Sequence, residues 1–411
     1  MTYTDAECDR ARRDFPALGE TVNGHAVAYL DGPGGTQTPN AVIDAVVACY
    51  RSRNANFDGK FATSIAVTEG VAAARRAVAD FLGADNPASI SFGANMTSLN
   101  FSLSHALGRG LKEGDELLVT ALDHEANRAP WLKLEERGAI VHEVRMDETG
   151  QIDMDDFTTK LGAKTRIVAV TLASNALGTV PDIDAVRVLA QSVGAMLVVD
   201  AVHYAAHFPV DVNALDCDFL LCSAYKFYGP HVGILYARPG LLDTLDTDRL
   251  RTQKADAPYR IETGTLNHVA IDGVRASIDY LAGWGTGSSR RDRLVDAMGA
   301  IARYEHELAR YYHDGLETIA GLTRWGPAFD AAPRAPTVSV TLERGTPEEA
   351  AAELGRTGLQ LWHGHFYALR VMECLGVAPG GMLRAGISMY NTRAEIDRLL
   401  EGLESFQGTR R

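Results

Sequence analysis

A lysine and an aspartate lie at the ends of two apolar runs in the middle of the chain. Ala195–Val199 is a continuous apolar run that stops at Asp200, and Asp218–Cys222 is followed after three residues by Lys226. Burial of a charge is costly, so charged side chains in apolar surroundings need a partner or a chemical role. One role uses both residues: Lys226 holds an aldehyde cofactor as a Schiff base, while Asp200 keeps a pyridine nitrogen protonated. The pair therefore predicts pyridoxal phosphate (PLP) chemistry, whereas either residue alone is explained as well by an ordinary strand-end side chain.

The motifs around these two residues resemble those of a known enzyme family. Asp200-Ala-Val-His203 and Ser223-Ala-Tyr-Lys226 are similar to the class V aminotransferase family of PLP enzymes, and most similar to its cysteine desulfurase group. The resemblance covers roughly residues 28–400. It implies PLP as the cofactor, an α-amino acid as the substrate and a homodimer as the active species.

The resemblance also assigns roles to residues that follow other strands. His124 matches a histidine that stacks on the pyridine ring and can move protons. Asn175 matches an asparagine that reaches the ring oxygen and the substrate carboxylate, and His203 replaces a glutamine that is common in desulfurases. Either a histidine or a glutamine can bond the ring oxygen. The expected catalytic residues are Lys226, His124 and Asp200.

The cofactor phosphate is expected at the turn Gly93–Ser98, which feeds a helix N-terminus whose free N–H groups and dipole favour an anion. Asn95 and Met96 stand where the family usually has two hydroxyl residues, and Tyr225 stands in place of a histidine. Thr265 resembles a residue that reaches the phosphate from the partner subunit, which implies a shared active site. The remaining expected cofactor contacts are Ala94, Asn95, Met96, Ser223, Tyr225 and Thr265.

An arginine late in the chain is the expected anchor for the substrate. Arg384-Ala-Gly-Ile-Ser-Met-Tyr-Asn391 matches the family's carboxylate-binding string, and a guanidinium fits a carboxylate bidentately. Gly34 belongs to a loop that lies beside the substrate in the family, although a plain turn explains this loop equally well. The other expected substrate contacts are Asn175, His365 and Tyr367.

The string around Tyr367 departs from the desulfurase pattern. Desulfurases carry Arg-x-Gly-His-His-Cys-Ala, and this chain carries Trp362-His-Gly-His-Phe-Tyr-Ala368. Their cysteine accepts sulfur as a persulfide, which a tyrosine cannot do. Cys374 lies seven residues beyond Tyr367 and is a poor substitute. The chain is therefore predicted not to form a persulfide, and the aromatic residues of the string predict a bulky substrate side chain.

Removal of the Cα proton by Lys226 leaves three reactions open. The resulting carbanion expels a β-substituent, is reprotonated at the cofactor to give transamination, or is reprotonated at Cα to give epimerisation. Because the resemblance is to desulfurases, we favour a β-eliminating lyase, with the carbon–sulfur bond as a candidate for cleavage. An aminotransferase and an epimerase are alternatives, and a non-catalytic PLP-binding scaffold is an alternative of another class.

The elements that position these residues alternate between strand and helix over residues 88–240, which favours a mainly parallel sheet covered by helices. The resemblance implies an α/β, fold-type-I PLP-dependent transferase, with a large domain on a mostly parallel seven-stranded sheet and a smaller α+β C-terminal domain. The expected boundaries are 29–285 for the large domain, and 1–28 with 286–411 for the small domain. A strand is also expected at Leu359–Trp362 and a helix at Phe366–Leu375. The expected strands of the large sheet are Ala88–Phe92, Glu116–Thr120, Ile140–Val144, Arg166–Leu172, Ala195–Val199, Asp218–Cys222 and Gly233–Ala237.

Composition excludes several classes of function. The 411 residues include 40 Lys+Arg and 53 Asp+Glu, and this net charge of −13 without a basic run argues against nucleic acids and anionic membranes as partners. The five cysteines have no metal-ligand spacing, so we expect no metal site. The N-terminus is unlike a signal peptide and no apolar run reaches membrane-spanning length, so we expect a cytoplasmic enzyme.

Overall fold

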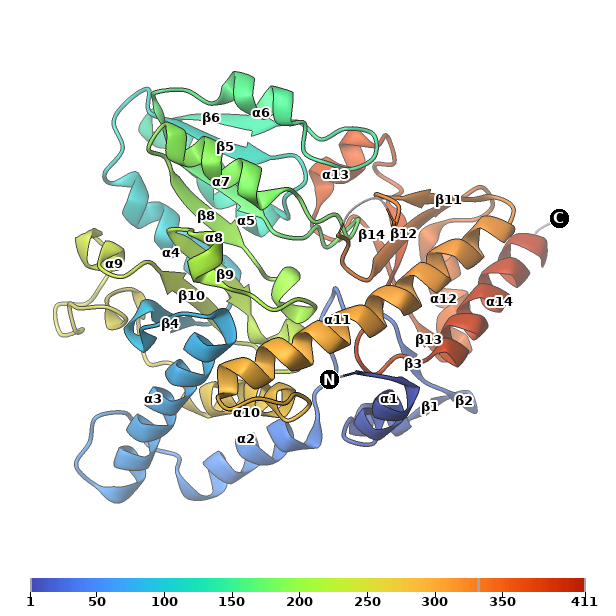
Figure 1. Ribbon diagram of the computed structural model, residues 1–411, viewed down its shortest axis with the longest axis horizontal. Helices are drawn as coiled ribbons and strands as arrows, with labels where there is room; N and C mark the ends of the chain where they lie inside the picture. Colours follow the sequence, from blue (N-terminus) through green and yellow to red (C-terminus); the bar gives the residue numbers. More distant parts are fainter. Residues whose placement is uncertain (1, 331–332, 410–411) are drawn as a thin grey trace.

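The computed structural model describes residues 2–330 and 333–409. Its central sheet has seven strands in the order β4-β10-β9-β8-β7-β5-β6 (Figure 1). β10 runs antiparallel to both of its neighbours, and the other strands are parallel to one another. This confirms the mostly parallel sheet of the predicted α/β fold. The strands are β4 (Ile90–Gly93), β5 (Glu116–Thr120), β6 (Ile140–Val144), β7 (Thr165–Thr171), β8 (Met196–Asp200), β9 (Phe219–Ser223) and β10 (Gly233–Ala237).

Both faces of this sheet are buried, which explains the unbroken apolar runs. Along β7, Val168 and Val170 belong to one hydrophobic cluster, and Ile167 and Ala169 belong to a second. Successive side chains of a strand point to opposite faces, so each face has its own core. Helices α3 (Ala62–Leu82) and α7 (Ile183–Ser192) contribute to the first cluster, and α4 (Met96–Gly108) and α5 (Glu125–Leu132) contribute to the second.

A second, antiparallel sheet lies in the C-terminal part, with the order β11-β12-β15-β14. Helix α12 packs on this sheet and against α14, and the long helix α11 runs from α10 to α14 (Figure 1). The smaller α+β domain is therefore present, while its boundaries at residues 28 and 286 stay predictions. The elements are β11 (Leu322–Trp325), β12 (Thr337–Leu342), β14 (Trp362–Gly364), β15 (Met382–Gly386), α10 (His268–Ala282), α11 (Arg290–Gly315), α12 (Pro347–Arg356) and α14 (Arg393–Thr409).

Short elements complete the described chain. Strand β3 pairs in parallel with β13, so the N-terminal segment is tied to the C-terminal part. The remaining α-helices and strands are α1 (Asp5–Arg12), β1 (Thr21–Val22), β2 (His25–Ala26), β3 (Ala28–Tyr29), α2 (Asn40–Ser52), α6 (Met154–Lys160), α8 (Val212–Leu215), α9 (Leu241–Thr244), β13 (Leu359–Gln360) and α13 (Leu369–Cys374).

Two predictions near residue 360 are wrong. The strand expected at Leu359–Trp362 is two strands in different sheets, because β13 pairs with β3 and β14 pairs with β15. The helix expected from Phe366 begins only at Leu369. Phe366 and Tyr367 have φ values of 54° and 56°, a left-handed conformation that no α-helix contains. They form a tight turn instead, and this turn lies at the site described below.

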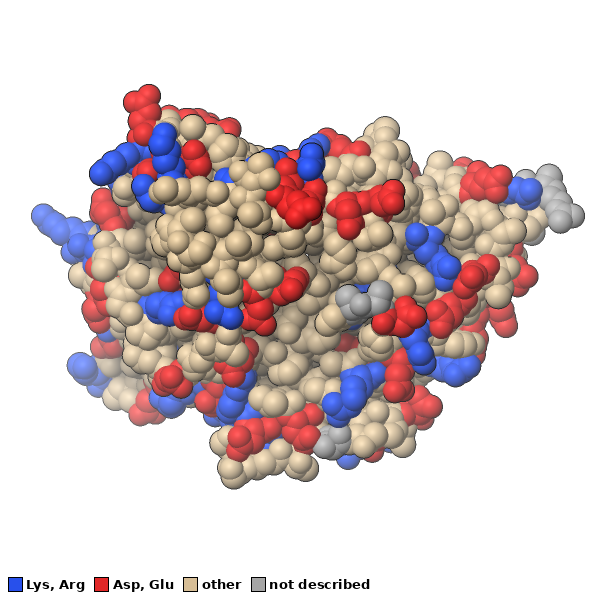
Figure 2. All heavy atoms as spheres, turned by 45° about the horizontal axis from the view of Figure 1, so that its top comes forward, with Lys and Arg blue, Asp and Glu red and all other residues tan. Residues whose placement is uncertain are grey.

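The surface carries mixed charge. Acidic and basic side chains are interspersed over the face in Figure 2, which shows no broad basic area. Within residues 2–330 and 333–409, no helix is long and apolar enough to cross a membrane. The same residues contain no group of three or more His, Cys, Asp or Glu side chains suited to hold a metal ion.

Candidate active site

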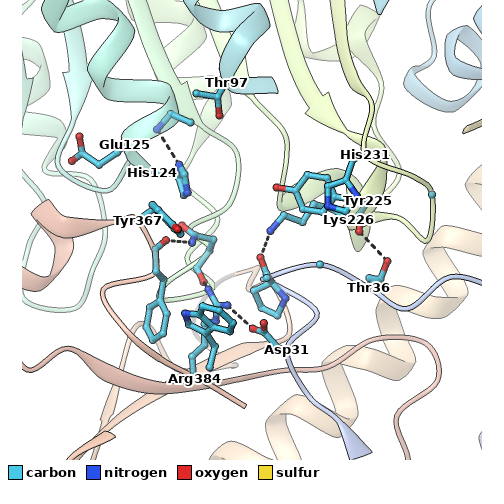
Figure 3. A pocket seen from close by; sticks show the side chains of 18 of the residues that line it. Asp31, Thr36, Thr97, His124, Glu125, Tyr225, Lys226, His231, Tyr367 and Arg384 are labelled. Carbon is cyan, nitrogen blue, oxygen red and sulfur yellow. Dashed lines mark hydrogen bonds and ion pairs between the residues drawn. The ribbon is translucent and has the colours of Figure 1, made fainter. Parts of the chain in front are cut away.

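A cavity of about 810 Å³ opens between loops of the large sheet and the C-terminal part (Figure 3). Lys226, His124, Asn175 and Arg384 all line it, although they come from four separate segments. A smaller pocket of about 60 Å³ adjoins it through shared residues. The smaller pocket is lined by Asn95, Met96, Thr97, His124, Ala126, Thr171, Ala173, Asn175, Asp200, Val202, His203, Ser223, Tyr225 and Lys226. The structure therefore brings together most of the residues that the sequence predicts.

Lys226 lies in the turn that follows β9, and it is 8% exposed. Its Nζ donates a hydrogen bond to the carbonyl of Pro33. Burial lowers the pKa of Lys226 to about 7, and the charge of Arg384 adds to this effect, while Asp31 and Asp200 oppose it. A large fraction of the amine is therefore unprotonated near neutral pH, as a nucleophile or a base requires.

Asp200 ends β8 and is buried in the smaller pocket. Its Oδ1 accepts a hydrogen bond of 2.8 Å from the backbone N–H of Val202, which orients the carboxylate. Burial raises the pKa of Asp200 to about 6. A buried carboxylate in this state gains strongly from a cationic N–H partner in the pocket.

His124 caps the N-terminus of α5, where its Nδ1 accepts a hydrogen bond of 2.9 Å from the N–H of Ala126. The ring proton of neutral His124 therefore sits on Nε2. Burial lowers the pKa of His124 to about 4, with smaller contributions from Lys226 and Arg384, so the ring is neutral at physiological pH. The ring of Tyr367 lies 5.7 Å away between centroids, at an angle of 33°.

Arg384 is 2% exposed and has two fixed partners. Its Nη2 lies 2.6 Å from the Asp31 carboxylate, and its Nη1 donates to the carbonyl of Asn175 at 3.0 Å (Figure 3). Its Nε is buried and has no hydrogen-bond partner among the described residues. The sequence analysis missed Asp31, for which the only signal was a carboxylate directly after a short apolar run.

Gly34 makes room for this ion pair. A Cβ added at Gly34 would collide with the carboxylate of Asp31. The space beside Gly34 is therefore filled by Asp31, and a direct contact of Gly34 with the substrate stays a prediction.

Replacement of Gly34 by alanine is expected to raise the KM for the amino-acid substrate about tenfold, because the displaced Asp31 no longer orients Arg384. Steady-state kinetics of Gly34→Ala measure this change. Gly19→Ala is the matched control, since its added methyl would meet no heavy atom within 4 Å. An unchanged KM in Gly34→Ala would show that the position of Asp31 does not affect substrate binding.

Only some of the residues expected at the phosphate lie together. Met96 N–H donates to Ser223 Oγ at 3.1 Å, and the Asn95 side chain caps α4 by accepting from Ser98 N–H at 2.8 Å. Ala94 and Thr265 instead line a separate pocket of about 380 Å³. A contact from Thr265 of the partner subunit stays a prediction.

Tyr225 stacks on a residue that the sequence analysis did not identify as a site residue. The rings of Tyr225 and His231 lie 4.7 Å apart at an angle of 12°. His231 lines both the main cavity and the separate pocket. The only signal for it in the sequence was its place five residues after Lys226.

The turn that carries Tyr367 is fastened to the large sheet through its backbone. Glu125 N–H donates to the carbonyl of Tyr367 at 2.8 Å, and Asn175 Nδ2 donates to the carbonyl of Phe366 at 2.8 Å. His365 Nδ1 accepts from Tyr367 N–H at 3.0 Å. The Tyr367 side chain itself is 63% exposed at the mouth of the cavity.

Cys374 lies on α13, which is outside the lining of the cavity. Arg370 of the same helix forms an ion pair of 2.7 Å with Glu143 of β6, which holds α13 against the large sheet. Partial burial raises the pKa of the Cys374 thiol. A raised pKa disfavours the thiolate that sulfur transfer needs.

The chemical types of the side chains around the two pockets are those expected of a PLP site. Lys226 provides an amine for an aldehyde, and Asp200 provides a buried carboxylate for a ring N–H. His203 Nδ1 is buried and has no hydrogen-bond partner in the described part of the chain, as expected of an atom that bonds a ligand oxygen. The N-terminus of α4, a helix of 13 residues, suits a phosphate.

Comparison with known proteins agrees with this chemistry. Residues 28–399 match the Aminotransferase class-V family. The chain is 34% identical over 412 residues to a cysteine desulfurase of Pectobacterium atrosepticum, covering 96% of this chain and 97% of the relative. It is 33% identical over 415 residues to a cysteine desulfurase of Yersinia pseudotuberculosis, covering 97% and 98%.

Solved structures show the same architecture. The apo structure of a cysteine desulfurase from Thermococcus onnurineus superposes with a TM-score of 0.87 at 29% identity, covering 97% of each chain. The S-sulfonic acid form of a cysteine desulfurase from Escherichia coli superposes with a TM-score of 0.83 at 26% identity, covering 97% of each chain. The predicted fold class is therefore confirmed.

Proposed function

Because this chain belongs to the class V aminotransferase family and is a cysteine desulfurase-like PLP enzyme, we propose that it is a lyase that eliminates a β-substituent from an α-amino acid without forming a persulfide on the protein. Tyr367 carries this proposal, since it occupies the position of the desulfurase cysteine in the string Trp362–Ala368. The position of Cys374 outside the cavity supports the same conclusion. A carbon–sulfur bond is the proposed bond to be cleaved.

Four side chains of the cavity and the adjoining smaller pocket account for the proposed reaction. Arg384, oriented by Asp31, binds the substrate carboxylate. PLP would supply an electron sink that acidifies the Cα–H of the amino acid, once the substrate amine has replaced Lys226 at the cofactor aldehyde. Asp200 would keep a proton at the ring nitrogen, and Nζ of Lys226, once freed from the cofactor, would take the Cα proton. His124, with its proton on Nε2, donates to the departing group.

Aromatic side chains around the mouth of the cavity support a bulky β-substituent. Tyr29, Phe101 and Tyr225 line the main cavity together with Trp362 and Tyr367. Their large apolar faces are suited to hold an aryl or extended alkyl group.

Product analysis with a panel of α-amino acids, bearing small and bulky β-substituents, tests the proposed function. We expect keto acid, ammonia and the leaving group in equal amounts, fastest for bulky substituents, while the visible absorbance of the cofactor recovers unaided. Accumulation of pyridoxamine phosphate until a keto acid is added would instead identify an aminotransferase. Racemisation without a leaving group would identify an epimerase, and no turnover of any member would favour a scaffold.

Replacement of Cys374 by alanine is expected to leave turnover within about twofold of the wild type, because surface changes away from the site have small effects. After turnover of cysteine by the wild type, the solution should contain free sulfide, and mass spectrometry of the protein should find no persulfide. Tyr367→Cys is the companion variant, since it restores the thiol of the family string. Persulfide on Cys374, or loss of turnover in Cys374→Ala, would contradict the proposal.

We propose that the active species is a homodimer, with Thr265 of the partner subunit at the phosphate. Ile43, Val47 and Tyr50 are exposed at helical spacing on α2, and Phe61 and Ile65 are exposed at the start of α3. An exposed apolar face of this kind is typical of a protein interface. Sedimentation equilibrium of the full chain tests this, and a monomer at micromolar concentration would rule the dimer out.

A further inference from the structure

Three buried side chains form a chain that leads away from the smaller pocket. His203, which lines that pocket, is 3% exposed, and His207 and Glu305 are 2% and 0% exposed. The rings of His203 and His207 lie 4.9 Å apart between centroids and meet edge to face, at 80°. His207 Nδ1 lies 2.8 Å from Glu305 Oε2. The last member belongs to α11, so the chain joins the cofactor pocket to the longest helix of the fold.

The partner of His203 determines which ring nitrogen carries the proton. His203 Nε2 lies 2.9 Å from Oγ1 of Thr337, a residue with no exposed surface. The contact fits either tautomer of His203, but the Thr337 hydroxyl has no other acceptor among the described residues, so we assign its hydrogen to Nε2. Neutral His203 then carries its proton on Nδ1, the buried atom that lacks a partner in the described part of the chain.

The charges around His203 keep its ring neutral. Burial lowers the pKa of His203 well below its ordinary value, and His207, Lys226 and Arg384 lower it further. His207 follows β8, Lys226 follows β9 and Arg384 lies on β15. Thr337 faces the His203 ring from β12. Asp200 lines the same pocket.

Glu305 and His207 have no other assigned role, and a fully buried carboxylate requires an explanation. His207 Nδ1 and Glu305 Oε2 lie 2.8 Å apart, and this hydrogen bond fixes the plane and position of the His207 ring. That ring in turn packs edge to face on His203 and limits how it can rotate.

We propose that His207 and Glu305 are positioning residues, which hold His203 as a neutral Nδ1–H donor toward the ring oxygen of PLP. The proposal rests on the proposed use of PLP. His207 and Glu305 act only through His203 and touch neither the substrate nor the cofactor.

The first test uses cofactor-free protein, so that it is independent of the proposed function. Nitrogen-15 NMR of histidine-labelled wild-type protein is expected to show His203 protonated on Nδ1, with assignment by the His203→Gln variant. In Glu305→Gln, which replaces the carboxylate partner of His207 by an amide, we expect a mixture of the two neutral His203 tautomers. Wild-type His203 protonated on Nε2 would overturn the proposal, even if Glu305→Gln does not fold.

The second test uses the pH midpoint of the cofactor's visible band in the holoenzyme. A hydrogen bond from His203 stabilises the anionic ring oxygen of the cofactor. Glu305→Gln should weaken this hydrogen bond and so raise the pH midpoint by about 0.5–2 pH units, which is the range of coupling within hydrogen-bonded networks. Glu307→Gln, an exposed change on the same helix, is the matched control and should not move the midpoint.

The same change in the His203→Gln background separates positioning from packing. If Glu305 acts through His203, Glu305→Gln should not shift the pH midpoint in the His203→Gln background, because a glutamine has no ring tautomer to be set. An equal shift in both backgrounds would show that Glu305 acts only through domain packing. Failure of the protein to bind PLP at all would instead contradict the proposed function, and the NMR result would still stand.

Discussion

Replacement of Lys226 by alanine is expected to lower turnover of the best amino-acid substrate by about 10²–10⁴-fold, the usual contribution of a positioned general base. The physical reason is that Lys226 is a buried amine whose pKa is lowered to about 7 by its surroundings. Lys226 lines both the main cavity and the smaller pocket that contains Asp200, and no other described lysine lines either of them. Steady-state and single-turnover kinetics of Lys226→Ala measure the loss.

Covalent attachment gives a second measurement on the same variant. Borohydride reduction followed by mass spectrometry should attach PLP to Lys226 in the wild type and to no residue in Lys226→Ala. Lys133→Ala is the control, because Lys133 forms only an exposed ion pair with Glu136. Full turnover in Lys226→Ala would contradict both its assigned roles and the proposed chemistry.

Replacement of Asp200 by asparagine is expected to lower turnover by about 10²–10³-fold, the size of effect seen when one preorganised electrostatic group is removed. Asparagine keeps an oxygen for the 2.8 Å hydrogen bond from Val202 N–H, so the local geometry is retained. The amide cannot keep a ring nitrogen protonated, so the carbanion is less stabilised. Turnover and PLP affinity of Asp200→Asn, measured together, distinguish a slower reaction from weaker binding of the cofactor.

Asp218→Asn is the matched control for this substitution. Asp218 precedes β9 and bonds the N–H of Leu197 at 2.8 Å, at the opposite ends of the strands from Lys226. It does not line either pocket. Equal losses in Asp200→Asn and Asp218→Asn would mean that the effect is structural rather than catalytic.

The sheet and the residues at its strand ends were predictable because burial on both faces leaves a strong pattern. β5 and β10 lie where the apolar runs predict them, since every side chain of β10 is buried and only the first residue of β5 is not. Asp200 stands out in the sequence because it comes directly after such a run, and Lys226 because it follows the next run after only three residues, where a charge is costly to bury. His124 and Asn175 needed the family resemblance, because polar residues in loops have no pattern of their own.

The remaining features depend on contacts between distant residues. Asp31 pairs with a residue 353 positions away, and Glu305 pairs with one 98 positions away, so neither contact leaves a local signal. The turn at Phe366 and Tyr367 was missed because nothing in the residue types requires φ values of 54° and 56°. The split of Leu359–Trp362 into two strands was missed because each half pairs with a different sheet.

The way in which the Tyr367 turn is fastened has a consequence for how new reactions arise in this scaffold. Glu125 and Asn175 hold the turn through the carbonyls of residues 367 and 366, which every amino acid possesses. Mutational drift can therefore exchange the side chain at position 367 without disrupting the turn, apart from β-branched residues, which its φ of 56° disfavours, and proline, whose ring requires a negative φ. Position 367 is thus a natural choice for a directed-evolution library, in which the side chain at the mouth of the cavity varies while the catalytic residues stay constant.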